Sequence, residues 1–182
     1  DRVVARRRLA RRLRGSDPVV IYSMGNVGTS SLQASIEAAT SRPVSKAHVI
    51  SAAGIARTLA ARGAPTRAAR PYGQWRSEQL RAEFRRPRDW TLICGVRDPV
   101  ARAVSTYFSD GLAADGATVD AVSAHVRELT SRDWFAEELE PTTGLDVYAT
   151  AFDPSVGCAT YRQGGFRLLL LRAEDLRRGG PA

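Results

Sequence analysis

The stretch "VVIYSMGNVGTSSL", residues 19–32, decides the fold of this chain of 182 residues. Its apolar beginning is typical of a parallel strand that is buried on both faces of a sheet. A glycine turn follows, in which Gly25 and Gly28 let the backbone turn tightly and approach an anion. Hydroxyl residues then stand where a helix begins. The stretch therefore predicts a strand, a tight loop and a helix, in that order.

Strands and helices alternate along the rest of the chain. The expected strands cover residues 18–24, 43–50, 90–96 and 166–172, and the expected helices cover 29–39, 51–62, 74–86, 98–112, 118–131 and 134–139. We therefore expect an α/β fold, a three-layer parallel sheet with helices on both faces. The segment 63–73 is expected to be a surface connection, and the rest of 134–165 to be irregular.

The basic charge of the chain is concentrated at its beginning. The formal net charge is +8, and seven of the 27 basic residues lie among residues 1–14. We expect a basic N-terminal tail or helix over residues 1–15, with Leu9 and Leu13 on one apolar stripe, and one domain over residues 16–182. Such a tail suits at most a peripheral contact with acidic lipids. No aromatic residues interleave with its arginines, which disfavours a nucleic-acid partner.

Cysteine content and hydropathy exclude several classes of protein. The two cysteines, Cys94 and Cys158, are too few for a disulfide framework and too isolated for a zinc site. No apolar run approaches the roughly 20 residues that cross a bilayer. We therefore expect a cytoplasmic protein.

The loop after the first strand carries the groups that bind anions. In a parallel sheet such a loop lies beyond the carboxyl end of the strand, where ligands bind. The backbone N–H groups of residues 28–31 would point into it, and the helix dipole adds partial positive charge. Thr29, Ser30 and Ser31 add hydroxyl donors. The alternative is a plain glycine turn with hydroxyl caps.

A second stretch, "GVRDPVARAVSTYF" at residues 95–108, is more specific. Arg97 ends an expected strand, and Asp98 caps a helix that has Pro99 at its first position. Ser105 follows two turns along that helix. An arginine fork and a serine hydroxyl in these positions can converge on one phosphate. The alternative is an Arg–Asp pair at a helix start with an unrelated surface serine.

Together the two stretches resemble the phosphate-binding motifs of sulfotransferases that use 3′-phosphoadenosine 5′-phosphosulfate (PAPS). The form is close to that of carbohydrate 2-O-sulfotransferases. Residues 134–154 and 166–176 also look like bacterial sulfotransferases associated with capsular polysaccharide synthesis, so the resemblance spans about residues 18–176. It implies a P-loop-like sulfotransferase fold, transfer of a sulfuryl group to a carbohydrate hydroxyl, the bisphosphate PAP as product, and no metal.

The resemblance also assigns residues to the cofactor. The 5′-phosphosulfate would lie on the loop formed by Gly25, Asn26, Val27, Gly28, Thr29, Ser30 and Ser31. Arg97 and Ser105 would hold the 3′-phosphate. In the family a basic, glycine-containing loop after the last strand covers the adenosine. Here that loop is expected to be either missing or shortened to residues 177–180.

Asn26 departs from the family pattern, which places a lysine at that position. Asparagine can donate a hydrogen bond but carries no charge, so it stabilises a leaving phosphate less than an ammonium does. Two readings therefore stay open: a working sulfotransferase and a non-catalytic nucleotide-binding relative. A P-loop kinase is disfavoured, because Thr29 stands where the kinase pattern has its lysine.

Sulfuryl transfer also needs a base for the proton of the acceptor hydroxyl. The family has a histidine in a comparable His-Val segment, so His48 is the candidate base. Lys46 points to the same face of an extended strand and would supply charge that Asn26 lacks. His125 is expected on a helix away from the strand ends. Other acidic residues are expected to support the fold or to form a solvated face: Glu137, Glu138, Glu140, Glu174 and Asp175.

Overall fold

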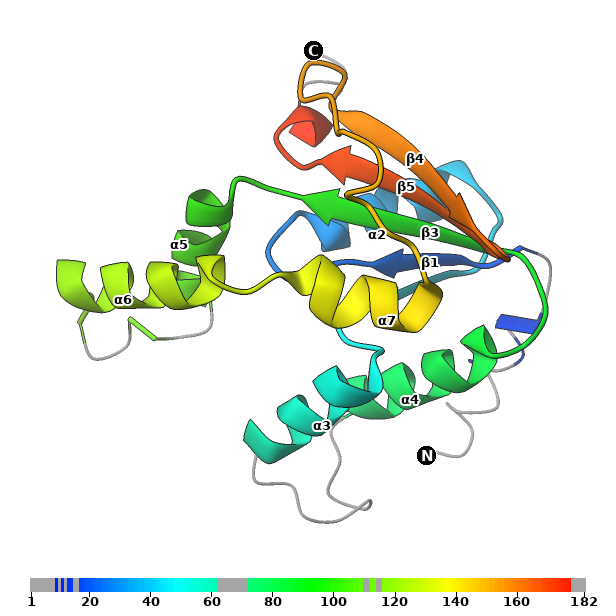
Figure 1. Ribbon diagram of the computed structural model, residues 1–182, viewed down its shortest axis with the longest axis horizontal. Helices are drawn as coiled ribbons and strands as arrows, with labels where there is room; N and C mark the ends of the chain where they lie inside the picture. Colours follow the sequence, from blue (N-terminus) through cyan, green and yellow to red (C-terminus); the bar gives the residue numbers. More distant parts are fainter. Residues whose placement is uncertain are drawn as a thin grey trace.

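The computed structural model describes residues 9, 11, 13–14, 17–61, 72–109, 112–113 and 116–177. Most of the expected basic tail, most of the connection at 63–73 and residues 178–180 lie outside this part of the chain. In the described part five strands form one sheet, in the order β2–β1–β3–β5–β4 (Figure 1). The strands are β1 (Val19–Tyr22), β2 (Val44–Ala47), β3 (Trp90–Val96), β4 (Cys158–Gln163) and β5 (Phe166–Arg172).

The helices follow the expected positions closely. They are α2 (Thr29–Ala39), α3 (Ala52–Ala61), α4 (Tyr72–Phe84), α5 (Pro99–Ser109), α6 (Val119–Thr130), the π-helix η2 (Phe135–Leu139), α7 (Glu140–Thr143) and the 3-10 helix η3 (Asp175–Arg177). The start of α5 has the expected cap, because the backbone N–H of Ala101 donates to Asp98 Oδ1 at 2.7 Å. None of the described helices is long and apolar enough to cross a membrane.

The sheet is mostly parallel rather than wholly parallel. β1, β2, β3 and β5 run in parallel, whereas β4 pairs antiparallel with β5 through a two-residue turn. Residues 158–163 lie in the segment that the sequence indicated as irregular, and that expectation was wrong. Of the six residues of β4 only Tyr161 is buried, so this edge strand lacks the apolar pattern that marks the others.

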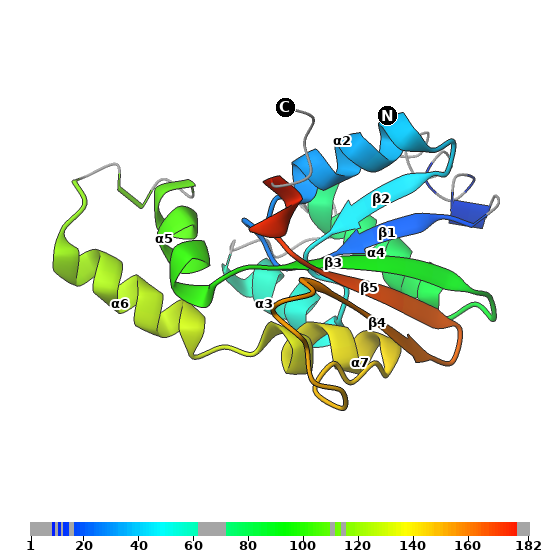
Figure 2. The ribbon, with the colours of Figure 1, turned by 90° about the horizontal axis from the view of Figure 1, so that it is seen from above.

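Helices cover both faces of the sheet. On one face Val19, Ile21 and Val44 pack against Leu32 and Ile36 of α2. The other face carries the larger core, to which α4 and η2 contribute Leu80, Phe84 and Leu139. Figure 1 shows α2 behind the sheet and α7 in front of it, and Figure 2 shows α2 beside β2 at the opposite end from β4. The three-layer arrangement is therefore confirmed.

Part of the expected N-terminal tail belongs to the domain. Leu9 and Leu13 are 7% and 0% exposed and lie in the larger core. Arg88 donates a hydrogen bond to the carbonyl of Leu13. The apolar stripe predicted for the tail thus anchors the segment to the domain.

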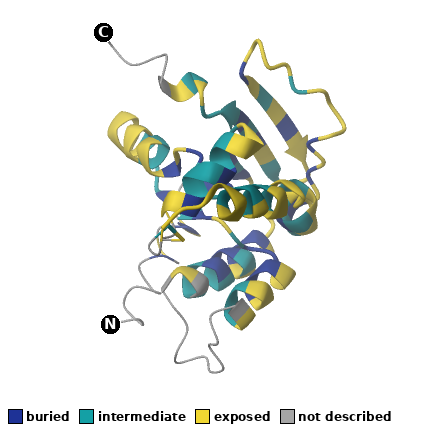
Figure 3. Cartoon of the chain, turned by 90° about the vertical axis from the view of Figure 1, so that its left-hand side faces the viewer, coloured by how far each residue is buried: buried dark blue, intermediate teal, exposed yellow. Residues whose placement is uncertain are grey.

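The order of the strands defines where a ligand binds. The chain passes from β1 to β2 on one side and returns to β3 on the other side of β1. A crevice forms at such a reversal, beyond the carboxyl ends of the two strands. The loop after β1 and Arg97 after β3 both lie there. From this end α5 and α6 extend beyond the sheet, and α6 has no buried residues (Figures 1 and 3).

Glu138 is buried, which corrects the expectation of a solvated acidic face for residues 137–140. It is 2% exposed and lies next to the buried Leu139 on η2. Its carboxylate accepts hydrogen bonds from the hydroxyl of Tyr22, the backbone N–H of Ile50 and both the N–H and hydroxyl of Ser51. A single carboxylate thus joins the end of β1, the start of α3 and η2.

Replacing Glu138 with alanine should destabilise the protein by about 3 kcal/mol, because several buried donors lose their acceptor at once. Urea unfolding followed by circular dichroism measures the change. Glu140→Ala is the control, since Glu140 is exposed on the same segment and its loss should change the free energy of unfolding by less than about 0.5 kcal/mol. Equal effects of the two substitutions would contradict the role given to Glu138.

Candidate functional site

The loop between β1 and α2 has the backbone of an anion-binding turn. Asn26 and Gly28 have φ angles of 61° and 76°, in the left-handed region. The first helical hydrogen bond runs from the N–H of Leu32 to the carbonyl of Gly28 at 3.0 Å. No side chain in the described part of the chain caps this helix start. The N–H groups of residues 29–31 are therefore available to an anion.

The loop is held against β3 by Ser23 and Gly95. The hydroxyl of Ser23 donates to the carbonyl of Gly95 at 2.9 Å and accepts from its N–H at 3.1 Å. A Cβ on Gly95 would lie 3.0 Å from the side chain of Val27 and 3.1 Å from its carbonyl oxygen. Val27 is 1% exposed, so among the predicted cofactor-binding residues it anchors the loop and does not offer its side chain to a ligand.

Asn26 ties the loop to α5. Its Nδ2 donates to Thr106 Oγ1 at 2.8 Å, and its Oδ1 accepts from Ser109 Oγ at 3.4 Å. Its carbonyl accepts from Arg97 Nη1 at 3.2 Å. One of the two N–H groups of the Asn26 amide is therefore already bound to α5.

Lys46 places its charge at the loop. It lies on β2, and its Nζ donates to Ser30 Oγ at 2.9 Å. The ammonium group therefore stands beside the hydroxyls that begin α2. This geometry is the one required if Lys46 supplies the charge that Asn26 lacks.

His48 follows β2 and is held at two points. Its Nδ1 lies 2.7 Å from the carbonyl oxygen of Ser23, and Trp134 Nε1 donates to the carbonyl of His48 at 3.1 Å. A carbonyl can only accept, so the neutral ring carries its proton on Nδ1 and leaves Nε2 as an acceptor. Nε2 is the atom that a general base would use.

These side chains converge on one cavity of about 560 Å³, the loop cavity. It is lined by Gly25, Asn26, Gly28, Thr29, Ser30, Ser31, Lys46, His48, Arg102 and Thr106. Two of these side chains, Lys46 and Arg102, are cationic, and no carboxylate is among the lining residues. The charge and the donors of this cavity suit a phosphate or a sulfate group.

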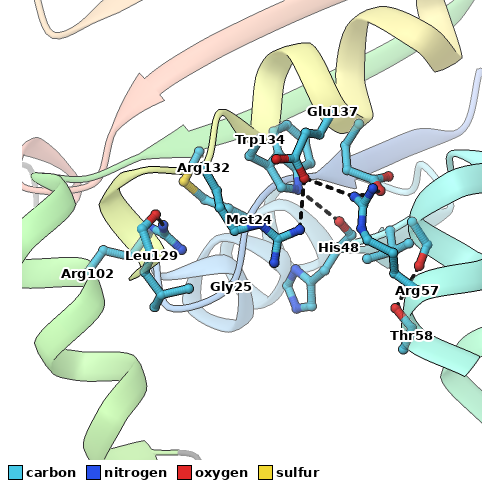
Figure 4. A pocket seen from close by; sticks show the side chains of 13 residues that line it. Met24, Gly25, His48, Arg57, Thr58, Arg102, Leu129, Arg132, Trp134 and Glu137 are labelled. Atoms are coloured by element: carbon cyan, nitrogen blue, oxygen red, sulfur yellow. Dashed lines mark hydrogen bonds and ion pairs between the residues drawn. The ribbon is translucent and has the colours of Figure 1, made fainter. Parts of the chain in front are cut away.

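A second cavity of about 380 Å³ adjoins the first and shares Gly25, His48 and Arg102 with it (Figure 4). Its other walls come from Arg57 on α3, from Leu129 and Arg132 at the end of α6, and from Trp134 and Glu137 around η2. His48 therefore lines both cavities and is accessible from each of them.

The predicted 3′-phosphate residues lie beside the loop cavity rather than in it. Arg97 lines a third cavity of about 410 Å³ together with Arg102 and Arg132. Ser105 is half-buried on α5 and is not among the residues that line these three cavities. The structure thus brings together the loop, Lys46 and His48, with Arg97 nearby and Ser105 apart.

Sequence reasoning missed Arg102 and Thr106, which line the loop cavity one turn apart on α5. Both belong to the stretch 95–108. Their positions along the helix that follows Arg97 were the signal that could have placed them at the site. His125 packs against Tyr107, with ring centroids 5.5 Å apart, and does not line these cavities. Glu174 accepts from the N–H of Asp98 at 3.0 Å, which confirms its supporting role.

Comparisons with protein-family models, with curated proteins and with solved structures find no match to this chain. No group of three or more metal-ligating side chains occurs in the described ranges.

Replacing Lys46 with methionine should weaken the binding of inorganic pyrophosphate about tenfold, because the cavity loses one of its two cationic groups. Isothermal titration calorimetry gives the dissociation constant. Arg162→Gln is the control, since Arg162 is exposed on β4 and its loss should leave the affinity unchanged. Unchanged affinity in Lys46→Met would remove this lysine from the site.

Proposed function

We propose that this chain is a PAPS-dependent sulfotransferase with a P-loop-like sulfotransferase fold, which transfers a sulfuryl group to a hydroxyl of a carbohydrate. The observation that carries the proposal is the loop cavity. The cavity is lined by an uncapped helix start, two cationic side chains and the histidine proposed as the base. It lies where the order of the strands reverses. The motifs at residues 19–32 and 95–108 support the same reading.

In this proposal the 5′-phosphosulfate lies on residues 25–31, where backbone N–H groups and three hydroxyls donate to it. Lys46 adds charge next to Ser30 and stabilises the negative charge that develops on the leaving phosphate. The 3′-phosphate lies towards Arg97, which lines the third cavity. Arg97 would then exchange its contact with the Asn26 carbonyl for a charged partner, which is the stronger interaction.

The chemistry is an in-line displacement at sulfur. The acceptor hydroxyl enters from the second cavity, and its oxygen forms a bond to sulfur while the bond from sulfur to the bridging oxygen of the phosphosulfate breaks. The electron pair of that bond stays on the phosphate of PAP. The hydroxyl proton passes to His48 Nε2, whose ring is oriented by the carbonyl of Ser23.

One observation favours a second candidate, a nucleotide-binding relative without catalysis. Asn26 is uncharged, and one N–H of its Nδ2 is bound to Thr106 Oγ1 at 2.8 Å. Such a protein would bind PAP and PAPS alike and would not turn over PAPS. Binding and turnover are therefore measured separately.

Calorimetric titration should show that adenosine 3′,5′-bisphosphate binds at least about 100-fold more tightly than ATP, because only the former has a 3′-phosphate for Arg97. Arg97→Ala should remove most of this difference. Arg127→Ala, an exposed arginine on α6, is the matched control and should keep it. Equal affinity for the two nucleotides would refute a PAPS site.

His48→Gln should lower the transfer of radiolabelled sulfate from PAPS to a mixture of polysaccharide fragments by about 10²-fold or more, because the base is lost. The affinity for the bisphosphate should stay within about twofold, since in this proposal the loop N–H groups, Lys46 and Arg97 hold its two phosphates. Full turnover in this variant would exclude His48 as the base. An inactive wild-type protein that still binds the bisphosphate would favour the second candidate.

A further inference from the structure

Two arginines lie opposite each other on the antiparallel strands β4 and β5. Arg162 pairs with Arg167 in the register of this hairpin, and both residues are exposed. The N–H of Arg172 donates to the carbonyl of Gly157 at 2.8 Å, and hydrogen-bonded pairs alternate along antiparallel strands. Arg162 and Arg167 therefore form a non-hydrogen-bonded pair, the kind in which side chains lie closest. Like charges in such positions destabilise a sheet, so the pair does not serve the fold.

A third arginine extends this pair into a row across the sheet. Arg42, which precedes β2, donates to Thr91 Oγ1 at 3.1 Å. Thr91 of β3 lies next to Arg167 of β5 in the parallel register, so both side chains stand on the same face. Figure 2 shows α2 beside β2, at the far side of the sheet from β4, and Arg162 and Arg167 are exposed. None of the three arginines has an ion pair with a carboxylate in the part of the chain that the structure describes.

Basic residues from the other layer lie at the same end of the sheet. The end of α4 and the start of β1 lie at the same end as the turn between β4 and β5, opposite α5 and α6 (Figure 1). Arg14 and Arg86 both pair with the buried carboxylate of Glu83, at 3.5 and 2.9 Å, and their own side chains are 55% and 51% exposed. Two guanidinium groups thus share one carboxylate, which leaves a positive charge at the surface.

Together these residues form the basic end of the domain. We define it by the segments that meet there, residues 13–14, 17–19, 42–44, 83–90 and 162–167. They hold seven arginines and three carboxylates, and one of the three is the buried Glu83. None of these residues lines the three cavities described above. The basic end therefore presents its charge on the surface of the domain and not in these cavities.

The chemistry of this surface favours a membrane over a nucleic acid. An arginine close to an anionic bilayer strengthens binding severalfold, and a planar layer of headgroups can contact arginines of both layers at once. Proteins that bind single-stranded nucleic acids stack the bases on exposed aromatic side chains. The aromatic residues of the basic end are Phe84 and Trp90, which are buried, and Phe166, which is half-buried.

We propose that the basic end docks onto a membrane surface that contains anionic lipids. Lipid phosphates between Arg162 and Arg167 would relieve the repulsion of this pair, and Arg14 and Arg86 would contact the same surface from the other layer. The loop cavity lies beyond the carboxyl ends of the strands, at the opposite end of the sheet, so docking would leave it accessible. The basic end is remote from the proposed catalytic site, and its role does not depend on the proposed function.

Sedimentation of the whole chain with lipid vesicles tests the proposal. Vesicles of phosphatidylcholine with about 30 mol% phosphatidylglycerol provide the anionic surface, and vesicles of phosphatidylcholine alone are the control. At about 0.1 M NaCl the protein should sediment with the anionic vesicles only. Raising the concentration to about 0.5 M NaCl should release it, because salt screens the charges.

Two variants with the same loss of charge locate the docking surface. Arg162→Gln combined with Arg167→Gln should weaken binding to the anionic vesicles about tenfold or more. Arg127→Glu lowers the net charge by the same amount on α6, at the opposite end of the sheet. It should keep the affinity within about threefold of that of the wild type, because a charge so far from the membrane is screened.

A third variant separates docking from folding. Arg162→Glu places opposite charges across β4 and β5, so the midpoint of thermal unfolding should be no lower than that of the wild type. Binding to the anionic vesicles should nevertheless fall about tenfold or more, because the same change replaces a positive charge of the docking surface with a negative one.

Several results would overturn the proposal: equal binding to both kinds of vesicle, no binding to either, or unchanged binding in the double variant. Equal losses in the double variant and in Arg127→Glu would also overturn it, because binding would then depend on net charge alone. A fluorescein-labelled RNA of about 20 nucleotides tests the other class of partner. RNA binding that the double variant weakens, without any binding to vesicles, would assign the basic end to a nucleic acid instead.

Discussion

The site depends on two hydrogen bonds by which Ser23, directly after β1, binds Gly95 of β3. These strands pair as far as Ile21 and Ile93. Beyond them the hydroxyl of Ser23 donates to the carbonyl of Gly95 and accepts from its N–H. Its carbonyl meanwhile binds His48. One residue thus fixes the separation of two strand ends and the orientation of the histidine. Gly95 allows this close approach, because a Cβ there would lie only 3.0 Å from the side chain of Val27.

Glu138 supports the same region from the other side. It fixes the chain at Ile50 and Ser51, just after His48, and binds Tyr22, just before Ser23. Trp134, next to η2, donates to the carbonyl of His48 and packs against Tyr22 with ring centroids 5.0 Å apart. His48 is therefore held from both neighbouring segments, which is the support that the proposed base would need. The same elements form the walls of the second cavity.

Local patterns in the sequence were enough to predict most of the fold. Continuous apolar runs marked β1, β3 and β5, and the Asp98–Pro99 pair marked the start of α5 within one residue. β4 was missed because only Tyr161 of its residues is buried, and β-propensity without burial gives no periodic signal. Glu138 was misjudged because the donors that satisfy its buried carboxylate come from Tyr22, Ile50 and Ser51, far away in the sequence.

The candidate site was predictable only where its residues lie on one motif or one strand. The glycine loop and the pair Lys46 and His48 could be placed at the same edge from strand order alone. Arg102 and Arg132 come together through the packing of α5 and the segment after α6, which the sequence does not encode locally. The partners of Asn26 on α5 were hidden for the same reason.

A crystal structure with bound adenosine 3′,5′-bisphosphate tests the central claim most directly. The account predicts the 5′-phosphate on the N–H groups of residues 28–31 with Lys46 beside it, and the 3′-phosphate within hydrogen-bond distance of Arg97. The adenosine would leave the second cavity open next to His48. A bisphosphate bound away from the loop, or with its 5′-phosphate turned from α2, would contradict the account.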